Sequence, residues 1–160
     1  MPTQRPSNRL TPEELELWRA LIRLSQLLPA ALEAGLSAAD ESLPRYEILA
    51  VLATHGDGLR LTELGRFALV SKPRLSVHVA SLETDGYVSR APHPDDARAS
   101  LVTLTAAGRR HLAALTPGHL EVARRVALDH IAPADREPVL RALASMLAAL
   151  GDSWTPGARP

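Results

Sequence analysis

The sequence contains no cysteine, which excludes disulfide bonds, thiolate metal ligands and the sensing of oxidants through a thiol. It also lacks an apolar run of about 18 residues, the length that a membrane-spanning helix needs, and it has no signal-peptide pattern. We therefore expect a cytoplasmic protein that does not enter a membrane. The polar first residues, 1–10, are predicted to be a disordered tail, and residues 152–160 a second tail.

Motifs for covalent catalysis are missing as well. The sequence has neither a G-x-S-x-G nucleophile motif nor a glycine-rich phosphate loop. Asp129 and His130 are neighbours in sequence, but adjacent side chains on a helix diverge and do not form a catalytic pair. We therefore predict that the protein is not an enzyme and that it carries no cofactor.

The six histidines raise the question of a metal site. His111, His119 and His130 could share one helix face, but Pro117 disturbs the helical spacing between the first two. Zinc requires several ligands held close together, and no compact cluster such as H-x-x-x-H is present. The sequence therefore predicts scattered, solvated histidines and no metal site.

The segment from residue 61 to residue 104 has the pattern of a helix, a tight turn, a second helix and a two-stranded hairpin. The second helix is predicted at residues 72–84. Ser71 can accept a hydrogen bond from the first-turn amides, Pro73 occupies a position that needs no donor, and Gly86 suits the left-handed end of a helix. This succession is typical of a winged helix-turn-helix, which places one helix in the major groove of DNA.

The two faces of this second helix differ in character. One face is an apolar stripe that must pack against a core, and it consists of Leu75, Val79 and Leu82. We expect Leu64, Phe67 and Leu69 of the preceding helix to complete this core. The opposite face carries small or polar side chains besides one valine and one arginine, and such a low profile lets a helix approach base edges. We predict these DNA contacts from the helix and its start: Ser71, Lys72, Pro73, Arg74, Ser76, Val77 and Ser81.

The hairpin is predicted to have strands at residues 87–90 and 100–104, and a tip at residues 92–96 that continues neither strand. Arg98 lies near the tip. An arginine on an exposed hairpin can reach a neighbouring minor groove, where narrow A·T-rich segments concentrate negative potential. Asp96 is predicted to hold the guanidinium of Arg98 in place.

The chain resembles the MarR family of bacterial transcription regulators. The residues that carry the resemblance are Thr62-Glu63-Leu64, Val70-Ser71-Lys72, Leu82-Glu83, Asp85-Gly86-Tyr87-Val88, the wing segment Pro94-Asp95-Asp96-Ala97-Arg98-Ala99-Ser100-Leu101-Val102, Leu104-Thr105 and Gly108-Arg109. The Asp-x-Arg wing tip is the most specific of these. The sequence departs from the family at Val77, where a polar or basic residue is usual, and at Ala97, which is often basic.

Amphipathic helices flank this lobe on both sides. Thr11, Pro12 and Glu14 predict a capped helix that Pro29 should kink or interrupt, and residues 42–55 predict a helix with Tyr46, Ile48, Leu49 and Leu52 inward. Thr105 caps a further helix, which Pro117-Gly118 should bend or break, and Pro133 begins a last one. The apolar faces predict dimerisation through both ends of the chain, with these interface residues: Leu15, Ile22, Val139, Leu143, Met146, Leu147 and Leu150.

We therefore predict a mainly α fold with a small β-hairpin wing. Residues 42–110 form the winged helix-turn-helix lobe, and residues 11–41 and 111–151 the dimerisation helices. The net charge is zero, but residues 60–110 carry eight Lys and Arg against five Asp and Glu. Together with the resemblance, this favours a homodimeric DNA-binding regulator, in particular a repressor, on a palindromic operator.

The resemblance also implies a pocket between the dimer helices and the DNA lobe for a small aromatic or anionic effector that releases the DNA. Trp18 and Tyr46 have suitable chemistry for its walls, although for Trp18 a place in the core is the favoured interpretation. Two alternatives remain open. One is a winged-helix module that binds protein, and the other is a small-molecule-binding dimer with weak DNA binding.

Overall fold

The structure of the protein, a computed structural model, describes residues 9–68, 70–93 and 96–152, except for the side chains of residues 96–98. The predicted tails and Leu69 therefore lie almost entirely outside the described residues. The helices and strands are α1 (Pro12–Ser37), α2 (Leu43–Thr54), β1 (Leu59–Arg60), α3 (Leu61–Phe67), α4 (Lys72–Thr84), β2 (Val88–His93), β3 (Asp96–Leu104), α5 (Ala106–Val126) and α6 (Arg136–Ala149), with short 3-10 turns η1 (Leu128–His130) and η2 (Pro133–Asp135) before α6.

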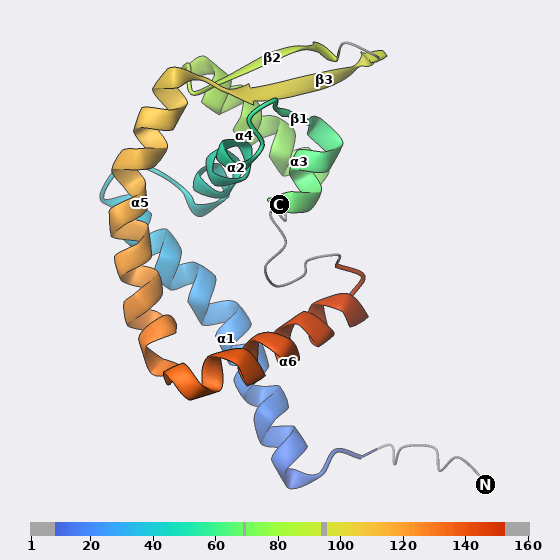
Figure 1. Cartoon of the computed structure of the whole chain (residues 1–160), viewed down its shortest axis with the longest axis vertical. Coiled ribbons are helices and arrows are strands. Elements are labelled where there is room, and N and C mark those ends of the chain that lie inside the picture. The colour runs from blue at the N-terminus through green and yellow to red at the C-terminus, as the bar shows by residue number, and fades with distance from the viewer. Residues whose placement is uncertain (1–8, 69, 94–95, 153–160) are drawn as a thin grey trace, which may run out of the picture.

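A compact lobe lies at one end of the molecule, where α2, α3 and α4 pack with an antiparallel sheet of strand order β1-β3-β2 (Figure 1). From the end of β3, α5 leads away from this lobe and packs against α1. Beyond α5 the chain turns, and α6 runs back below the lobe in Figure 1. This arrangement confirms the predicted fold class, a mainly α chain with a small β wing.

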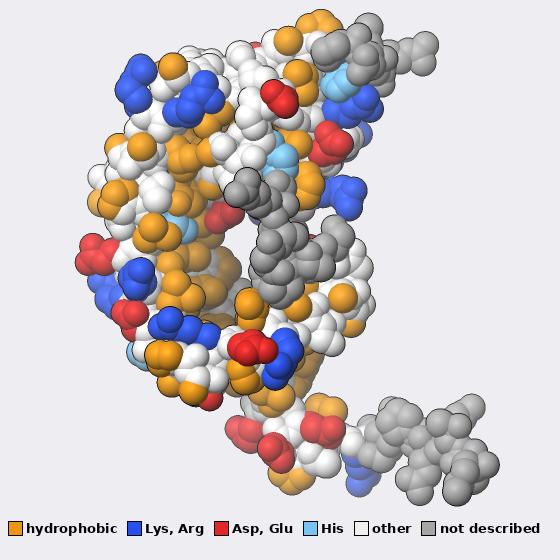
Figure 2. Space-filling model, in the orientation of Figure 1, with side chains coloured by type: hydrophobic (Ala, Val, Ile, Leu, Met, Phe, Trp, Pro, Cys, Tyr) orange, Lys and Arg blue, Asp and Glu red, His pale blue; other side chains and the backbone are white. Residues whose placement is uncertain are grey.

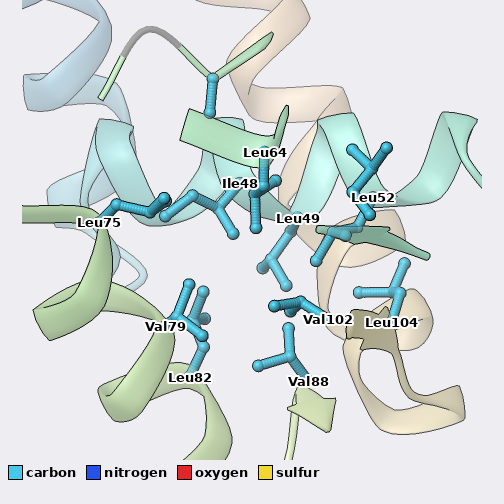
Figure 3. Packing of buried hydrophobic residues seen from close by; sticks show 12 residues of the cluster. Ile48, Leu49, Leu52, Leu64, Leu75, Val79, Leu82, Val88, Val102 and Leu104 are labelled. Carbon is cyan, nitrogen blue, oxygen red and sulfur yellow. The ribbon is translucent and has the colours of Figure 1, made fainter. Parts of the chain in front are cut away.

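The core of the lobe lies between α2, α3, α4 and the sheet (Figure 3). The predicted stripe of α4 and the predicted inward residues of α2 are all buried, which confirms both patterns. Phe67 was expected in this core, but it is 44% exposed. Ala68, one residue further on, continues the buried stripe of α3, and the ring of Phe67 instead stacks on His55 with the centroids 5.1 Å apart.

The helix ends follow local sequence signals with one exception. At the start of α1, the hydroxyl of Thr11 accepts from the backbone N–H of Glu14, whose carboxylate accepts from the N–H of Thr11. Thr105 likewise caps α5. Helix α4 has the predicted bounds, and Gly86, two residues after its end, has a φ of 76°. Ser71 precedes α4 but makes no side-chain capping bond, contrary to prediction. Because this end is exposed, water can satisfy the first-turn amides.

Two prolines fail to end their helices. Pro29 lies inside a continuous α1 and Pro117 inside a continuous α5, so neither proline interrupts its helix, and the alternative expectation of a kink or bend stays a prediction. A proline removes one backbone hydrogen bond and strains the turn before it. These two helices pack against each other, and such tertiary contact supplies most of a helix's stability in a protein.

The hairpin extends further toward its tip than the sequence indicates. Strand β2 continues through Pro92 and His93, and β3 begins at Asp96, so the prediction that the tip residues join neither strand is wrong. Strand β2 lies at the edge of the sheet, where a proline is tolerated because one side of the strand has no partner to bond. The register shifts between Pro92 and His93.

The short strand β1 was not predicted, because two residues carry no readable alternation. It pairs with β3 through Leu59 opposite Val102. Gly58, just before it, has φ 85°, and a Cβ at this position would meet the carbonyl oxygen of Val102 at 2.6 Å. A glycine is therefore required where the chain turns against the sheet.

The single chain leaves large apolar surfaces uncovered. Hydrophobic side chains gather in the hollow that α1, α5 and α6 border (Figure 2). Trp18, one of the candidates for the core, is 54% exposed. Other exposed residues of the two terminal helices are Leu17, Ile22, Leu24, Leu27, Leu140, Leu143, Met146 and Leu150, which lies just after α6. None of the helices in the described part of the chain has the length and apolar character of a membrane span.

Candidate nucleic-acid interface

The exposed face of α4 lies opposite its buried stripe. At 3.6 residues per turn, Pro73, Val77 and Ala80 follow one another along this outer face, and all three are exposed. We call these three residues the apolar strip. Lys72 and Arg74 are exposed beside its start, so the first turn of α4 presents positive charge next to small apolar groups. The predicted face of α4 is thus accessible in the structure.

Two hydroxyl groups near this face, those of Ser76 and Ser81, are already engaged within the protein. The Ser76 hydroxyl donates to the carbonyl of Lys72 at 3.3 Å. The Ser81 hydroxyl accepts from the guanidinium of Arg45, which comes from α2. A base contact by Ser81, as the sequence suggested, would therefore have to share this hydroxyl with Arg45.

Arg45 fixes the C-terminal end of α4. Its Nη2 lies 2.8 Å from a carboxylate oxygen of Asp85, directly after the helix, and its Nε lies 2.6 Å from a carboxylate oxygen of Glu41. Most of the Arg45 side chain is buried. The orientation of α4 is therefore tied to α2 and to the segment between α1 and α2.

Glu41 is the centre of this network and is only 5% exposed. Its second carboxylate oxygen lies 2.8 Å from Nε2 of His111, which is on α5. The His111 ring stacks on Tyr87, and the two ring centroids are 4.1 Å apart. Burial alone would raise the pKa of Glu41, but hydrogen bonds from Arg45 and His111 outweigh it and lower the pKa. Sequence reasoning missed Glu41, because a single acid between two helices has no pattern.

The wing is joined to α4 by a second ion pair. The guanidinium of Arg90 on β2 donates two hydrogen bonds to one carboxylate oxygen of Glu83 near the end of α4. These hydrogen bonds lower the pKa of Glu83. The pair fixes the base of the wing relative to α4. The backbone places Asp96 and Arg98 in β3, but their side chains lie outside the described residues, so their predicted roles stay predictions.

Two of the histidines are less solvated than predicted. His111 bonds Glu41 as described above, and His119 is half-buried with its ring stacked on Tyr46 at a centroid distance of 4.0 Å. Burial lowers the pKa of His119, and its Nδ1 has no hydrogen-bond partner in the described part of the chain. The described residues include no group of three His, Asp or Glu side chains that could hold a metal ion.

The two candidate effector residues lie apart within one chain. Tyr46 is buried against Leu36 and Leu115, near the C-terminal end of α1. Trp18 lies 18 residues before Leu36 on the same continuous helix, which corresponds to roughly 27 Å at the α-helical rise. One pocket within a single chain does not contain both side chains.

An exposed helix, positioned by a short preceding helix and flanked by a two-stranded wing, defines a winged helix-turn-helix protein. Residues 39–99 match the model of the MarR family. A stretch of 106 residues, which is 66% of this chain, is 31% identical to the HTH-type transcriptional repressor YetL of Bacillus subtilis. A shorter part, 67 residues or 41% of this chain, is 33% identical to the transcriptional activatory protein BadR of Rhodopseudomonas palustris.

The chain spans 64% of the length of the repressor and 38% of the length of the activator. Similarity to a solved structure extends much further. Sco3205, a MarR family transcriptional regulator from Streptomyces coelicolor crystallised in complex with DNA, is 31% identical, with a TM-score of 0.81. The match covers 99% of this chain and 98% of that chain. The chain belongs to the MarR family, whose members are transcriptional regulators and not enzymes.

Proposed function

We propose that the protein is a sequence-specific DNA-binding regulator of transcription that acts as a homodimer on a palindromic operator. The observation that carries the proposal is the exposed outer face of α4, with Lys72 and Arg74 beside the apolar strip and the buried stripe behind it. Ser71, Lys72 and the start of α4 contact phosphates, and Arg74 with Ser76 contacts bases or nearby phosphates. The DNA complex of the similar Streptomyces regulator supports this use of the fold.

Dimerisation through the terminal helices would cover the uncovered apolar surface. None of the residues of α6 is buried in the single chain, and in α1 only Leu36 is. A helix with an apolar face requires a partner to remove that face from water. The predicted interface residues, from Leu15 and Ile22 in α1 to Leu147 and Leu150 in and after α6, are accessible for this purpose.

The wing is the second DNA contact in the proposal. Arg98 enters the minor groove beside the half-site that α4 reads, and Asp96 supports its guanidinium. The Glu83–Arg90 pair favours this arrangement, because it links the base of the wing to α4. Two such units related by two-fold symmetry read half-sites about one helical turn apart.

Regulation is proposed to be repression that a small aromatic or anionic effector relieves. The matched relatives include one named repressor and one named activator, and repression is the function that the longer match favours. Tyr46, packed with His119 where α1, α2 and α5 meet, is the first predicted effector contact, and Trp18 remains the second. An effector regulates only if it binds two spacings of the DNA lobes with different affinity.

The test is selection of bound duplexes from a random pool by the purified full chain. The proposal predicts enrichment of a palindrome, and weaker binding to it as salt rises. Arg74→Ala should reduce this affinity, whereas Arg141→Ala, which removes an exposed arginine from the side of α6 opposite the predicted interface residues, should not. A protein-binding winged-helix module would show no salt-dependent DNA affinity. A small-molecule-binding dimer would enrich no sequence.

A further inference from the structure

The apolar strip is unusual in its exposure. Val77 is 68% exposed, whereas the other large hydrophobic residues of α4 are at most 1% exposed. Pro73 lies one turn before Val77, and Ala80 lies about one turn after it. The strip therefore forms a narrow apolar ridge along the middle of the face that the proposed function turns toward DNA.

Hydrogen-bond donors on this face are few. The Ser76 and Thr84 hydroxyls donate to backbone carbonyls of α4 itself, and Ser81 is bonded to Arg45. Arg74 is the long donor on the outer face, at its edge. The central part of the face can therefore discriminate bases mainly through apolar contact.

The major groove offers one apolar feature that depends on sequence, the 5-methyl group of thymine. We propose that the apolar strip, with Val77 at its centre, contacts pyrimidine 5-methyl groups and selects thymine at one or more positions of each half-site. This inference rests on the proposed function. Lys72 and Arg74 beside the strip favour DNA over a protein as the partner, because they provide the charge that the phosphates on either side of the groove require.

The position of the strip along the helix fits this role. Base contacts in helix-turn-helix proteins come chiefly from the N-terminal part of the helix in the groove. Pro73 and Val77 lie in the first two turns of α4, whereas Thr84 is the last residue of the helix. The three residues of the strip are small enough to let the helix axis approach the base edges.

The experiment replaces thymine by deoxyuridine, one position at a time, in a duplex that the wild-type chain has selected. This change removes only the methyl group and leaves every hydrogen-bonding group in place. At a contacted position, wild-type affinity should fall roughly fourfold per half-site, the effect of returning one methyl-sized apolar contact to water. Val77→Ala should bind the thymine and deoxyuridine duplexes almost equally.

Thr84→Ser is the matched control, because it removes one methyl group from the far end of the same helix and keeps its hydroxyl. It should preserve the wild-type preference for thymine. Since Val77 is exposed and alanine is the better helix former, Val77→Ala should melt at or slightly above the wild-type temperature, which a thermal scan checks.

The inference is overturned if the wild type binds equally well with deoxyuridine at every thymine, or if Val77→Ala keeps the full preference for thymine. A strip that binds a protein would give the first of these results. Failure of the proposed function is a different outcome, namely that no duplex is enriched in the selection at all.

Discussion

Arg45 of α2 and Asp85, the residue after α4, form an ion pair of 2.8 Å that holds the end of the exposed helix against the body of the lobe. The same guanidinium bonds Ser81 in the last turn and the buried carboxylate of Glu41. A helix that must fit a groove needs a fixed axis, and this arginine joins three segments to supply one.

Arg45→Ala should destabilise the fold and weaken DNA binding. The substitution leaves Glu41 buried with one charged partner fewer, and breaking such a pair costs about 3 kcal/mol of unfolding free energy. Denaturant titration measures this loss. Arg141→Ala is the control, because the Arg141–Glu137 pair is exposed and contributes close to nothing. Equal stability of Arg45→Ala and Arg141→Ala would contradict the role given to Arg45.

Glu41 should make the unfolding free energy depend on pH in the acidic range. Its pKa is lowered in the folded chain from the usual 4.5, so its contribution is complete above the pKa of the unfolded chain and is lost as the pH falls through the folded pKa. Glu41→Gln should be less stable than the wild type at neutral pH and should lose less stability on acidification. Urea titrations at several pH values below about 6 measure the difference. Parallel losses in both proteins would show that the carboxylate is not the titrating group.

His119 should also make the unfolding free energy fall as the pH falls, but in a higher pH range than Glu41. Burial lowers the pKa of His119 in the folded chain from its usual 6.5. As the pH falls through this range, the unfolded chain therefore binds a proton more readily than the folded chain, and the unfolding free energy decreases. His119→Phe preserves an aromatic ring against Tyr46 but removes this proton. We expect the unfolding free energy of the variant to vary less than that of the wild type on either side of pH 6. An unchanged pH dependence would exclude His119 as its source.

How far the sequence predicted the structure depends on how local each signal is. The bounds of α4 follow from Pro73 and Gly86, and its buried stripe follows from helical periodicity, because both are decided within one element. Glu41 and Arg45 could not be predicted as a pair with Ser81 and Asp85, because the packing of α2 on α4 brings them together. Local patterns do not contain that packing.

Phe67 shows the same limit in the core. A large aromatic residue near a buried stripe is an obvious core candidate, but α3 ends at this residue and Ala68 takes the inward position. The candidate DNA-binding residues of α4 were predicted as a face, and the structure adds which of their hydroxyls are already bonded. The wing residues Asp96 and Arg98 remain predictions from sequence.

Arg98→Ala tests the wing. It should weaken binding by roughly 1 to 3 kcal/mol at operators whose flanks are A·T-rich, with a smaller effect where G·C pairs replace those flanks. Fluorescence anisotropy with the two kinds of duplex measures both affinities. If Asp96 holds this guanidinium as proposed, Asp96→Asn should show a weaker form of the same effect, because it removes the carboxylate charge. Unchanged affinity of Arg98→Ala at both operators would remove the wing from the DNA contact.

Whether the outer face of α4 lies against DNA is tested by the salt dependence of binding to the selected duplex. Wild-type affinity should fall steeply as salt rises, with a linear relation between the logarithms of the two quantities. Lys72→Ala should weaken binding to all duplexes alike and reduce that slope by about one for each subunit bound. A slope that Lys72→Ala leaves unchanged, or wild-type affinity that is independent of salt, would contradict the account.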